Sequence, residues 1–322
     1  MLAPSITASA PAAAAAIDRA VVSTVAYGDV FDYPLSAFEV HRYLHGVRAT
    51  PDATASALAR CVADGVVVLR DGHYTLPHRQ RLVETRQSRA VRAAEYWPAA
   101  IRYGQIIAGM PFVRMVAVTG SLAWDNVPPS ADIDYVVVAE PDHLWKCRWL
   151  LAVLRRVARL EGINLCPNCM VTKRALTVWD HDLYVAYEMA SMKPIAGLGM
   201  YRRLRRANPW TAGFLPNAND ELRPPDLDVP SEHTMSHRFL SKVSGLGEDM
   251  LRSRFGAMLE GLEMQYRIRK IMKFRSRLML QQGIELGEAS YGADRCMGFG
   301  GGHRRRALSA FAARLDAFGA TP

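Results

Sequence analysis

Val113-Arg-Met-Val-Ala-Val-Thr119 is a β-rich run that ends in Gly120-Ser121, and Asp132-Ile-Asp-Tyr-Val-Val-Val-Ala139 is a second such run after a ten-residue interval. Pro128 and Pro129 lie in that interval, so the two runs predict two strands joined by a loop. Side chains two positions apart on a strand point to the same face of the sheet. Asp132 and Asp134 are therefore expected to present their carboxylates side by side.

Two adjacent carboxylates repel each other in an apolar sheet unless a cation lies between them. Mg²⁺, or Mn²⁺ in its place, takes oxygen ligands and keeps positions for water and for substrate phosphates. Gly120 lets the backbone come close to a phosphate, and Ser121 offers a hydroxyl and an N–H as donors. The segment therefore predicts that Asp132 and Asp134 bind a divalent metal ion and act in catalysis. Gly120 and Ser121 are expected to bind the phosphates of ATP or another nucleoside triphosphate.

This ordered combination resembles the nucleotidyltransferase superfamily typified by DNA polymerase β, whose motif is a hydrophobic residue, Gly, then Gly or Ser, and later Asp-x-Asp. The resemblance implies a metal-dependent transfer of a nucleoside monophosphate from a nucleoside triphosphate to an acceptor. Over most of the chain after Ile17, the sequence is also similar to bacterial proteins that join such a domain to an N-terminal winged helix. This second similarity is carried by Phe31-Asp-Tyr-Pro34, Trp145 with Arg148, Cys166-Pro-Asn168, Tyr184 to Glu188, Asn208-Pro-Trp210 and Phe214-Leu-Pro-Asn217. This similarity does not indicate which molecule accepts the nucleoside monophosphate.

A third carboxylate is usual in active members of the superfamily, on the strand after the following helix. That strand is expected here over residues 163–172, which contain no acid. Asn168 is expected at the equivalent place and is a candidate metal ligand through its amide oxygen. Asp180, Asp182 and Glu188 are alternatives that lie outside the expected position. Since some active members use two carboxylates, the resemblance leaves open both an active site and one that binds nucleotide without turnover.

Two basic side chains are candidates for further phosphate contacts. Arg148 lies on a helix expected from about Pro141 to Glu161, and Lys173 follows the strand expected to end near Thr172. A cation beside a triphosphate forms charge-assisted hydrogen bonds to its oxygens. The alternative for both residues is an ordinary surface charge.

The N-terminal residues 17–80 predict a winged helix-turn-helix, with helices over 18–27, 36–45 and 53–63 before a hairpin. Ser36 and Glu39 have the spacing of a capping box, and Asp71-Gly72 between two β-rich runs is typical of a hairpin turn. The third helix, which is expected to begin near Asp52, offers little positive charge beyond Arg60. DNA binding therefore stays open beside packing on the next domain or recognition of RNA or protein.

The rest of the chain completes an α+β fold in which a small mixed β-sheet flanked by helices follows the winged helix. Residues 1–16 are rich in Ala, Pro, Ser and Thr and are expected to form a disordered tail rather than a signal peptide. Residues 81–112 predict a connecting helix with Pro98 near its end, and residues 113–200 the nucleotidyltransferase domain, with a fourth strand over 176–179. From about Leu183 the sequence is expected to be helical, and residues 201–322 form a helical C-terminal region.

The composition of the chain indicates which binding partners and which cellular compartment to expect. The 322 residues carry a formal net charge of +9, which favours a polyanionic partner such as RNA or DNA beside a protein acceptor. No apolar run is long enough to span a bilayer, so no membrane partner is expected. The five scattered cysteines predict a reducing cytoplasm, and the lone Cys166-Pro-Asn-Cys169 lacks the second ligand pair of a usual zinc site. The alternative to an enzyme is a catalytically lapsed regulator that senses nucleotides or binds DNA.

Overall fold

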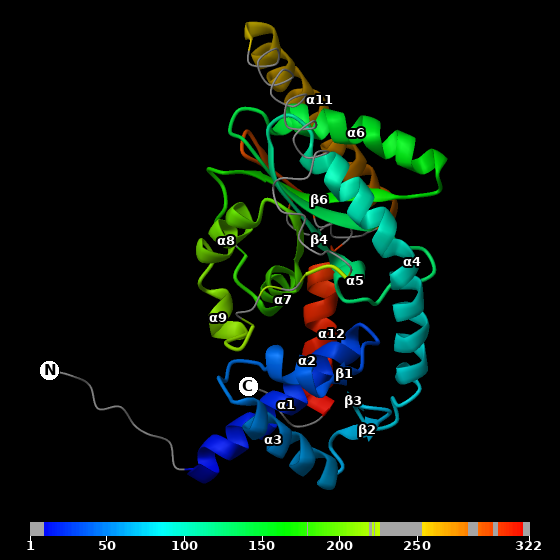
Figure 1. Cartoon of the computed structure of the whole chain (residues 1–322), viewed down its shortest axis with the longest axis vertical. Coiled ribbons are helices and arrows are strands. Elements are labelled where there is room, and N and C mark those ends of the chain that lie inside the picture. Colours follow the sequence, from blue (N-terminus) through cyan, green and yellow to red (C-terminus); the bar gives the residue numbers. More distant parts are fainter. Residues whose placement is uncertain are drawn as a thin grey trace, which may run out of the picture.

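The computed structural model describes residues 10–178, 180–218, 221, 223–225, 253–282, 289–298 and 302–317. Within them the chain is a mixed α+β structure with one three-stranded and one six-stranded sheet. Figure 1 shows a mainly helical N-terminal unit at one end of the molecule, the larger sheet towards the other, and α12 (His303–Ala317) between them. None of the helices in these ranges has the length and apolar character needed to cross a membrane.

The N-terminal unit, residues 10–76, contains three helices and three short strands. They are α1 (Ala10–Val30), β1 (Leu35–Ser36), α2 (Ala37–Arg42), α3 (Pro51–Ala63), β2 (Val68–Arg70) and β3 (His73–Thr75). Ser36 and Glu39 form the capping box that their spacing predicts, because each side chain bonds the other residue's backbone N–H. Asp71 and Gly72 join β2 to β3 with φ values of 48° and 74°, the left-handed values of a tight hairpin turn.

Two helix starts in this unit differ from expectation. Helix α1 begins at Ala10, so residues 10–16 are helical although the sequence predicted a disordered tail; residues 1–9 lie outside the described ranges. The alanine run at 12–16 explains the extension, since alanine has the highest helix propensity. Thr50, not Asp52, caps α3 by accepting from the Ala53 N–H, with Pro51 at the first helical position, where a proline costs no hydrogen bond.

Helix α4 (Leu82–Ala108) connects the N-terminal unit to the larger sheet and runs along the side of the molecule (Figure 1). Pro98 was expected near the end of this helix and lies inside it instead. Buried Trp97 and Tyr103 flank the proline and pack into the core beside the sheet. Their burial offsets the single backbone hydrogen bond that a proline removes from a helix.

The larger sheet has the strand order β7-β4-β5-β6-β9-β8, in which β5 and β6 are parallel and all other neighbours antiparallel. Its strands are β4 (Val113–Thr119), β5 (Ile133–Ala139), β6 (Leu165–Thr172), β7 (Lys193–Ala196), β8 (Ala289–Gly292) and β9 (Arg295–Gly298). The three central strands match the predicted runs. The expectation of helix from Leu183 onward was wrong at β7, β8 and β9, which are short strands that depend on pairing with the sheet rather than on local pattern. Residues 176–178 do not form the expected fourth strand, and Trp179 lies outside the described residues.

Helices cover both faces of the sheet. Ile133, Tyr135 and Val137 of β5 pack in a core with α4, α6 (Leu144–Leu160) and α11 (Arg254–Gln282). Val136 and Val138 pack on the opposite face in a core with α7 (Leu183–Ser191) and α8 (Leu198–Arg206). Strand side chains alternate between faces, so Asp134 belongs to the α7 side.

Polar and aromatic contacts fix the N-terminal unit against the rest of the molecule. The Asp29 carboxylate, only 6% exposed, accepts from Arg79 Nε at 2.8 Å and from Arg314 Nε of α12 at 2.6 Å. The ring of Tyr27 stacks on that of Tyr187 of α7 with 4.2 Å between centroids. These contacts come from three different elements, so α1, α7 and α12 hold one another in place.

Candidate active site

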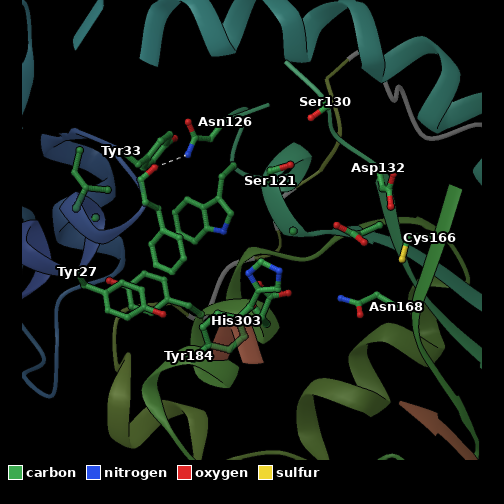
Figure 2. A pocket seen from close by; sticks show the side chains of 18 residues that line it. Tyr27, Tyr33, Ser121, Asn126, Ser130, Asp132, Cys166, Asn168, Tyr184 and His303 are labelled. Atoms are coloured by element: carbon green, nitrogen blue, oxygen red, sulfur yellow. Dashed lines mark hydrogen bonds between the residues drawn. The ribbon is translucent and has the colours of Figure 1, made fainter. Parts of the chain in front are cut away.

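A cavity of about 640 Å³ lies between the N-terminal unit and the end of the larger sheet where β4 finishes and β5 begins. Figure 2 shows Asp132, Cys166 and Asn168 on one side of this cavity and Tyr27 and Tyr33 on the other. The carboxylate side is lined by Gly120, Ser121, Ser130, Asp132, Asp134, Cys166, Asn168 and Glu188. The aromatic side is lined by Tyr27, Phe31, Tyr33, Trp124 and Tyr187, together with Gly28, Leu35 and Asn126, and Tyr184 and His303 lie between the two sides. The volume is in the range of cavities that hold a small organic ligand.

Strand register places the two aspartates. Asp134 pairs with Thr119 of β4 and with Cys166 of β6, so its carboxylate stands where three strand ends meet. Asp132 directly precedes β5, and its exposed side chain also lines the cavity. Neither carboxylate forms an ion pair with any residue that the structure describes, which leaves their charge for a ligand.

Gly120 brings the turn after β4 into contact with Asp134. Its φ of +67° is left-handed, and a side-chain carbon at this position would lie 2.5 Å from Asp134 Oδ2. Only a glycine meets both conditions without strain. Ser121 follows on the short helix α5 (Gly120–Ala123) and lines the same cavity.

A β-bulge in β6 brings Asn168 to the cavity. Tyr135 pairs with Pro167 and Val136 with Cys169, which leaves Asn168 as the extra residue between them. Bulges redirect one side chain out of the regular alternation, as they often do beside functional sites. Asn168 therefore lines the same cavity as the two carboxylates.

Burial shifts the pKa values of acidic groups on the carboxylate side of the cavity. Desolvation raises the pKa of Asp134 to about 7, with the nearby charges of Glu188 and Asp132 adding to the increase, while a hydrogen bond from the Cys166 thiol opposes it. Burial also raises the pKa of Cys166 to about 12, so this thiol stays protonated as a donor. A cation bound between the aspartates would favour their charged forms.

Glu188 supplies a third carboxylate from α7 rather than from β6. It accepts from Thr119 Oγ1 at 2.6 Å and from the Gly120 N–H, and burial raises its pKa. Glu188 therefore holds the turn at Gly120 in place through these two hydrogen bonds. The sequence offered Glu188 as one of three alternatives, and its one distinguishing signal is a single acid in an otherwise apolar helix. The other two, Asp180 and Asp182, pair with Arg304 of α12 and do not line the cavity.

Arg148 and Lys173 do not line the cavity, so the structure gives no support to their expected phosphate contacts. Lys173 follows Thr172, which pairs with Ala139 at the far end of β5 from Asp134, and its Nζ lies 2.6 Å from Glu140 Oε1. Arg148 lies on α6, which covers the opposite face of the sheet, and bonds the Cys296 thiol there. Sequence spacing placed both residues near the motif without specifying the face or end of the sheet.

No group of three or more His, Cys, Asp or Glu side chains within the described ranges has the arrangement of a metal site. The donor set here is two aspartates with an amide oxygen, which suits a hard cation that completes its shell with water and phosphate oxygens. The chain matches no protein-family model, no curated protein and no solved structure.

Proposed function

We propose that the protein is a metal-dependent nucleotidyltransferase of the DNA polymerase β type, using Mg²⁺ or Mn²⁺ and ATP or another nucleoside triphosphate. One observation carries the proposal: Gly120, Ser121, Asp132, Asp134 and Asn168, selected from sequence alone, line one cavity.

Each residue has a role in this proposal. Asp132 and Asp134 hold the cation with help from the Asn168 amide oxygen, and Ser121 donates to phosphate oxygens. A bound divalent ion supplies charge stabilisation at those oxygens. A hydroxyl or amine of the acceptor attacks the α-phosphorus, the bond to the bridging oxygen breaks, pyrophosphate leaves, and the acceptor's proton passes to water. Glu188 is a positioning residue that acts through the Thr119-Gly120 turn.

The N-terminal unit has the element order of a winged helix, and we propose that it belongs to this class. Its α3 gives little support to DNA recognition, because Arg60, the one basic residue of that helix, pairs with Asp18 at 2.6 Å. DNA binding through a helix depends on cations that contact phosphates. The role that we favour for the unit is to close the cavity. All five cysteines are free thiols, in keeping with a cytoplasmic location.

Calorimetric titration of ATP into the protein, with and without Mg²⁺, tests the proposal. The Asp132→Asn, Asp134→Asn double variant should lose the Mg²⁺-dependent binding and remain folded. The Asp52→Asn, Asp64→Asn double variant removes the same charge from exposed positions of the N-terminal unit and should bind as the wild type does. Undiminished Mg²⁺-dependent binding by the first double variant would overturn the metal site.

Turnover requires a second measurement. Pyrophosphate release from ATP in the presence of RNA, protein or small-molecule fractions should depend on Asp132 and Asp134. Mg²⁺-dependent binding with no release in any fraction would favour the lapsed, nucleotide-sensing alternative.

A further inference from the structure

We propose that the N-terminal unit holds the nucleobase of the donor nucleotide by stacking on Phe31 and Trp124, opposite the aspartates that hold its phosphates. The inference rests on the proposed function and adds the position of the base and the kind of selectivity that follows. It gives the N-terminal unit a role in substrate binding within its own chain.

The first observation is the division of the cavity into two chemically different ends. Carboxylates and small polar side chains surround one end, the aromatic rings of Tyr27, Phe31, Tyr33, Trp124 and Tyr187 gather at the other, and Tyr184 and His303 lie between them. A nucleoside triphosphate has the same division, with a charged phosphate chain at one end and a planar ring at the other. Aromatic side chains bind nucleobases by stacking, at about 1–3 kcal/mol per base.

The second observation concerns α5, which connects the two ends. Ser121 lies in this short helix, and Trp124 is its C-cap residue. Both line the cavity, and one turn of chain therefore serves the phosphate end and the ring end. The spacing of Ser121 and Trp124 is fixed by this turn, whereas the position of Phe31 depends on the packing of the N-terminal unit against it.

Phe31 is unusual among the aromatic residues of the wall. It is 37% exposed, whereas Tyr27 and Tyr33 beside it are 3% and 6% exposed. Its ring contacts Tyr27 with 5.4 Å between centroids. The Phe31 ring is therefore held by a tilted contact and keeps exposed surface that a ligand would cover.

The backbone at Phe31 is held in place from the neighbouring loop. Asn126 Nδ2 donates to the Phe31 carbonyl at 3.1 Å, and Asn126 Oδ1 accepts from Arg89 Nη1 at 3.2 Å. Arg89 Nη1 also donates to the Phe31 carbonyl, at 3.1 Å. The Asn126 side chain thus holds the Phe31 backbone through its amide nitrogen and contacts Arg89 through its amide oxygen. Stacking on a ring is tolerant of base identity, because every base has a ring face.

Trp124 is likewise supported on several sides. Its ring lies 4.6 Å from the Tyr43 ring and 5.6 Å from the Tyr33 ring, centroid to centroid. Both partners belong to the N-terminal unit, whereas Trp124 belongs to the segment between β4 and β5. A ring bound here would therefore contact both parts of the molecule and stabilise their association.

Comparison of two ligands tests the inference on the full chain. Mg²⁺-tripolyphosphate carries the phosphates without a base, and Mg²⁺-ATP carries both. Phe31→Ala should weaken Mg²⁺-ATP binding by about 5- to 100-fold, the loss of one stacking contact, and leave Mg²⁺-tripolyphosphate binding unchanged. Phe31→Trp should restore ATP binding. Phe38→Ala is the matched control, since Phe38 is 61% exposed on α2 and does not line the cavity.

The outcomes separate this inference from the proposed function. Unchanged ATP affinity in Phe31→Ala would overturn the base position and would leave the metal site standing. Equal losses for ATP and tripolyphosphate would also overturn it, because the residue would then act on the phosphate end. Failure of the wild type to bind either ligand with Mg²⁺ would overturn the proposed function and this inference together.

Discussion

Gly120 and Asp134 are in such close contact that a methyl group on Gly120 would lie 2.5 Å from the Oδ2 atom of Asp134. The two residues belong to different strand ends, brought together because Thr119 pairs with Asp134. The glycine of the motif is therefore required by its neighbour as well as by its own φ of +67°. A substitution that alters the turn at Gly120 should therefore also move the Asp134 carboxylate.

Replacement of Gly120 tests this coupling. Gly120→Ala should displace the Asp134 carboxylate and reduce Mg²⁺-ATP affinity by at least about tenfold. Gly162→Ala is a matched control: Gly162 has φ of +74°, and nothing lies within 4 Å of its added methyl group. Both variants should lose about 1 kcal/mol of stability from the left-handed backbone. The coupling is wrong if calorimetry finds the same ATP affinity in both.

Asp134 should make stability depend on pH. Its pKa is about 7 in the folded protein against 3.8 for the free side chain, so the stability it contributes is present below about pH 3.8 and is lost as the pH rises through 7. At pH 8 without metal, Asp134→Asn should therefore be more stable than wild type by about 1–3 kcal/mol, with little difference near pH 4. Mg²⁺ should reduce this difference in stability between Asp134→Asn and the wild type at pH 8. Urea unfolding at both pH values, with EDTA or Mg²⁺, measures this, and a pH-independent difference would contradict it.

Glu188 should act mainly as an acceptor for the turn. Glu188→Gln keeps an acceptor oxygen and should lower Mg²⁺-ATP affinity less than about tenfold. Glu188→Leu leaves the Thr119 hydroxyl and the Gly120 N–H without their acceptor and should cost about 1–3 kcal/mol of stability with a larger loss of binding. Thermal unfolding and calorimetry of both variants measure the two effects. Complete loss of ATP binding in a well-folded Glu188→Gln would instead give the carboxylate charge a direct role.

His45 should make the contact between the N-terminal unit and α7 less stable at acidic pH. Its ring bonds Ser23 Oγ at 2.7 Å and the Tyr187 hydroxyl at 2.8 Å, and burial lowers its pKa to about 3 from 6.5. Stability from neutral His45 is present above pH 6.5 and is lost as the pH falls towards 3. At pH 5 the loss from this residue should be about 2 kcal/mol relative to pH 7.5.

Unfolding of His45→Gln at both pH values measures this contribution. The variant should show a smaller loss between pH 7.5 and pH 5 than the wild type, since glutamine does not titrate. His181→Gln changes an exposed histidine and should behave as the wild type does. An unchanged pH dependence in His45→Gln would assign acid sensitivity to other groups.

Local pattern was sufficient for the elements whose residues specify them directly. The β-branched run of β4 and the capping box at Ser36 are examples, and so is Asp71-Gly72 in the hairpin. Asp132 and Asp134 could be expected in one place because they lie two positions apart at the start of a β-rich run, although β5 itself begins at Ile133. These inferences use neighbours a few positions apart in the sequence.

Sequence reasoning was insufficient where position depends on contacts between distant segments. The bond between Glu188 and Thr119 joins α7 to β4, and the sequence gives no spacing from which to infer it. The four residues of β7 acquire their strand conformation by pairing with β4. Lys173 was a candidate phosphate contact with a surface charge as the alternative, and it follows the end of β6 that is remote from Asp134. The position of Lys173 relative to Asp134 depends on the topology of the sheet, which a local sequence pattern does not specify.

Strand β6 has β9 as its outer neighbour, and β9 comes from near the end of the chain. During synthesis the ribosome therefore releases the candidate metal ligands long before the strand that covers this edge, and His303 of the cavity wall emerges later still. Domains fold as they emerge, and an uncovered strand edge pairs readily with other chains. A chain that ends before β9 therefore leaves this edge of β6 unpaired. The wall of the cavity that His303 supplies is likewise absent until α12 has been synthesised.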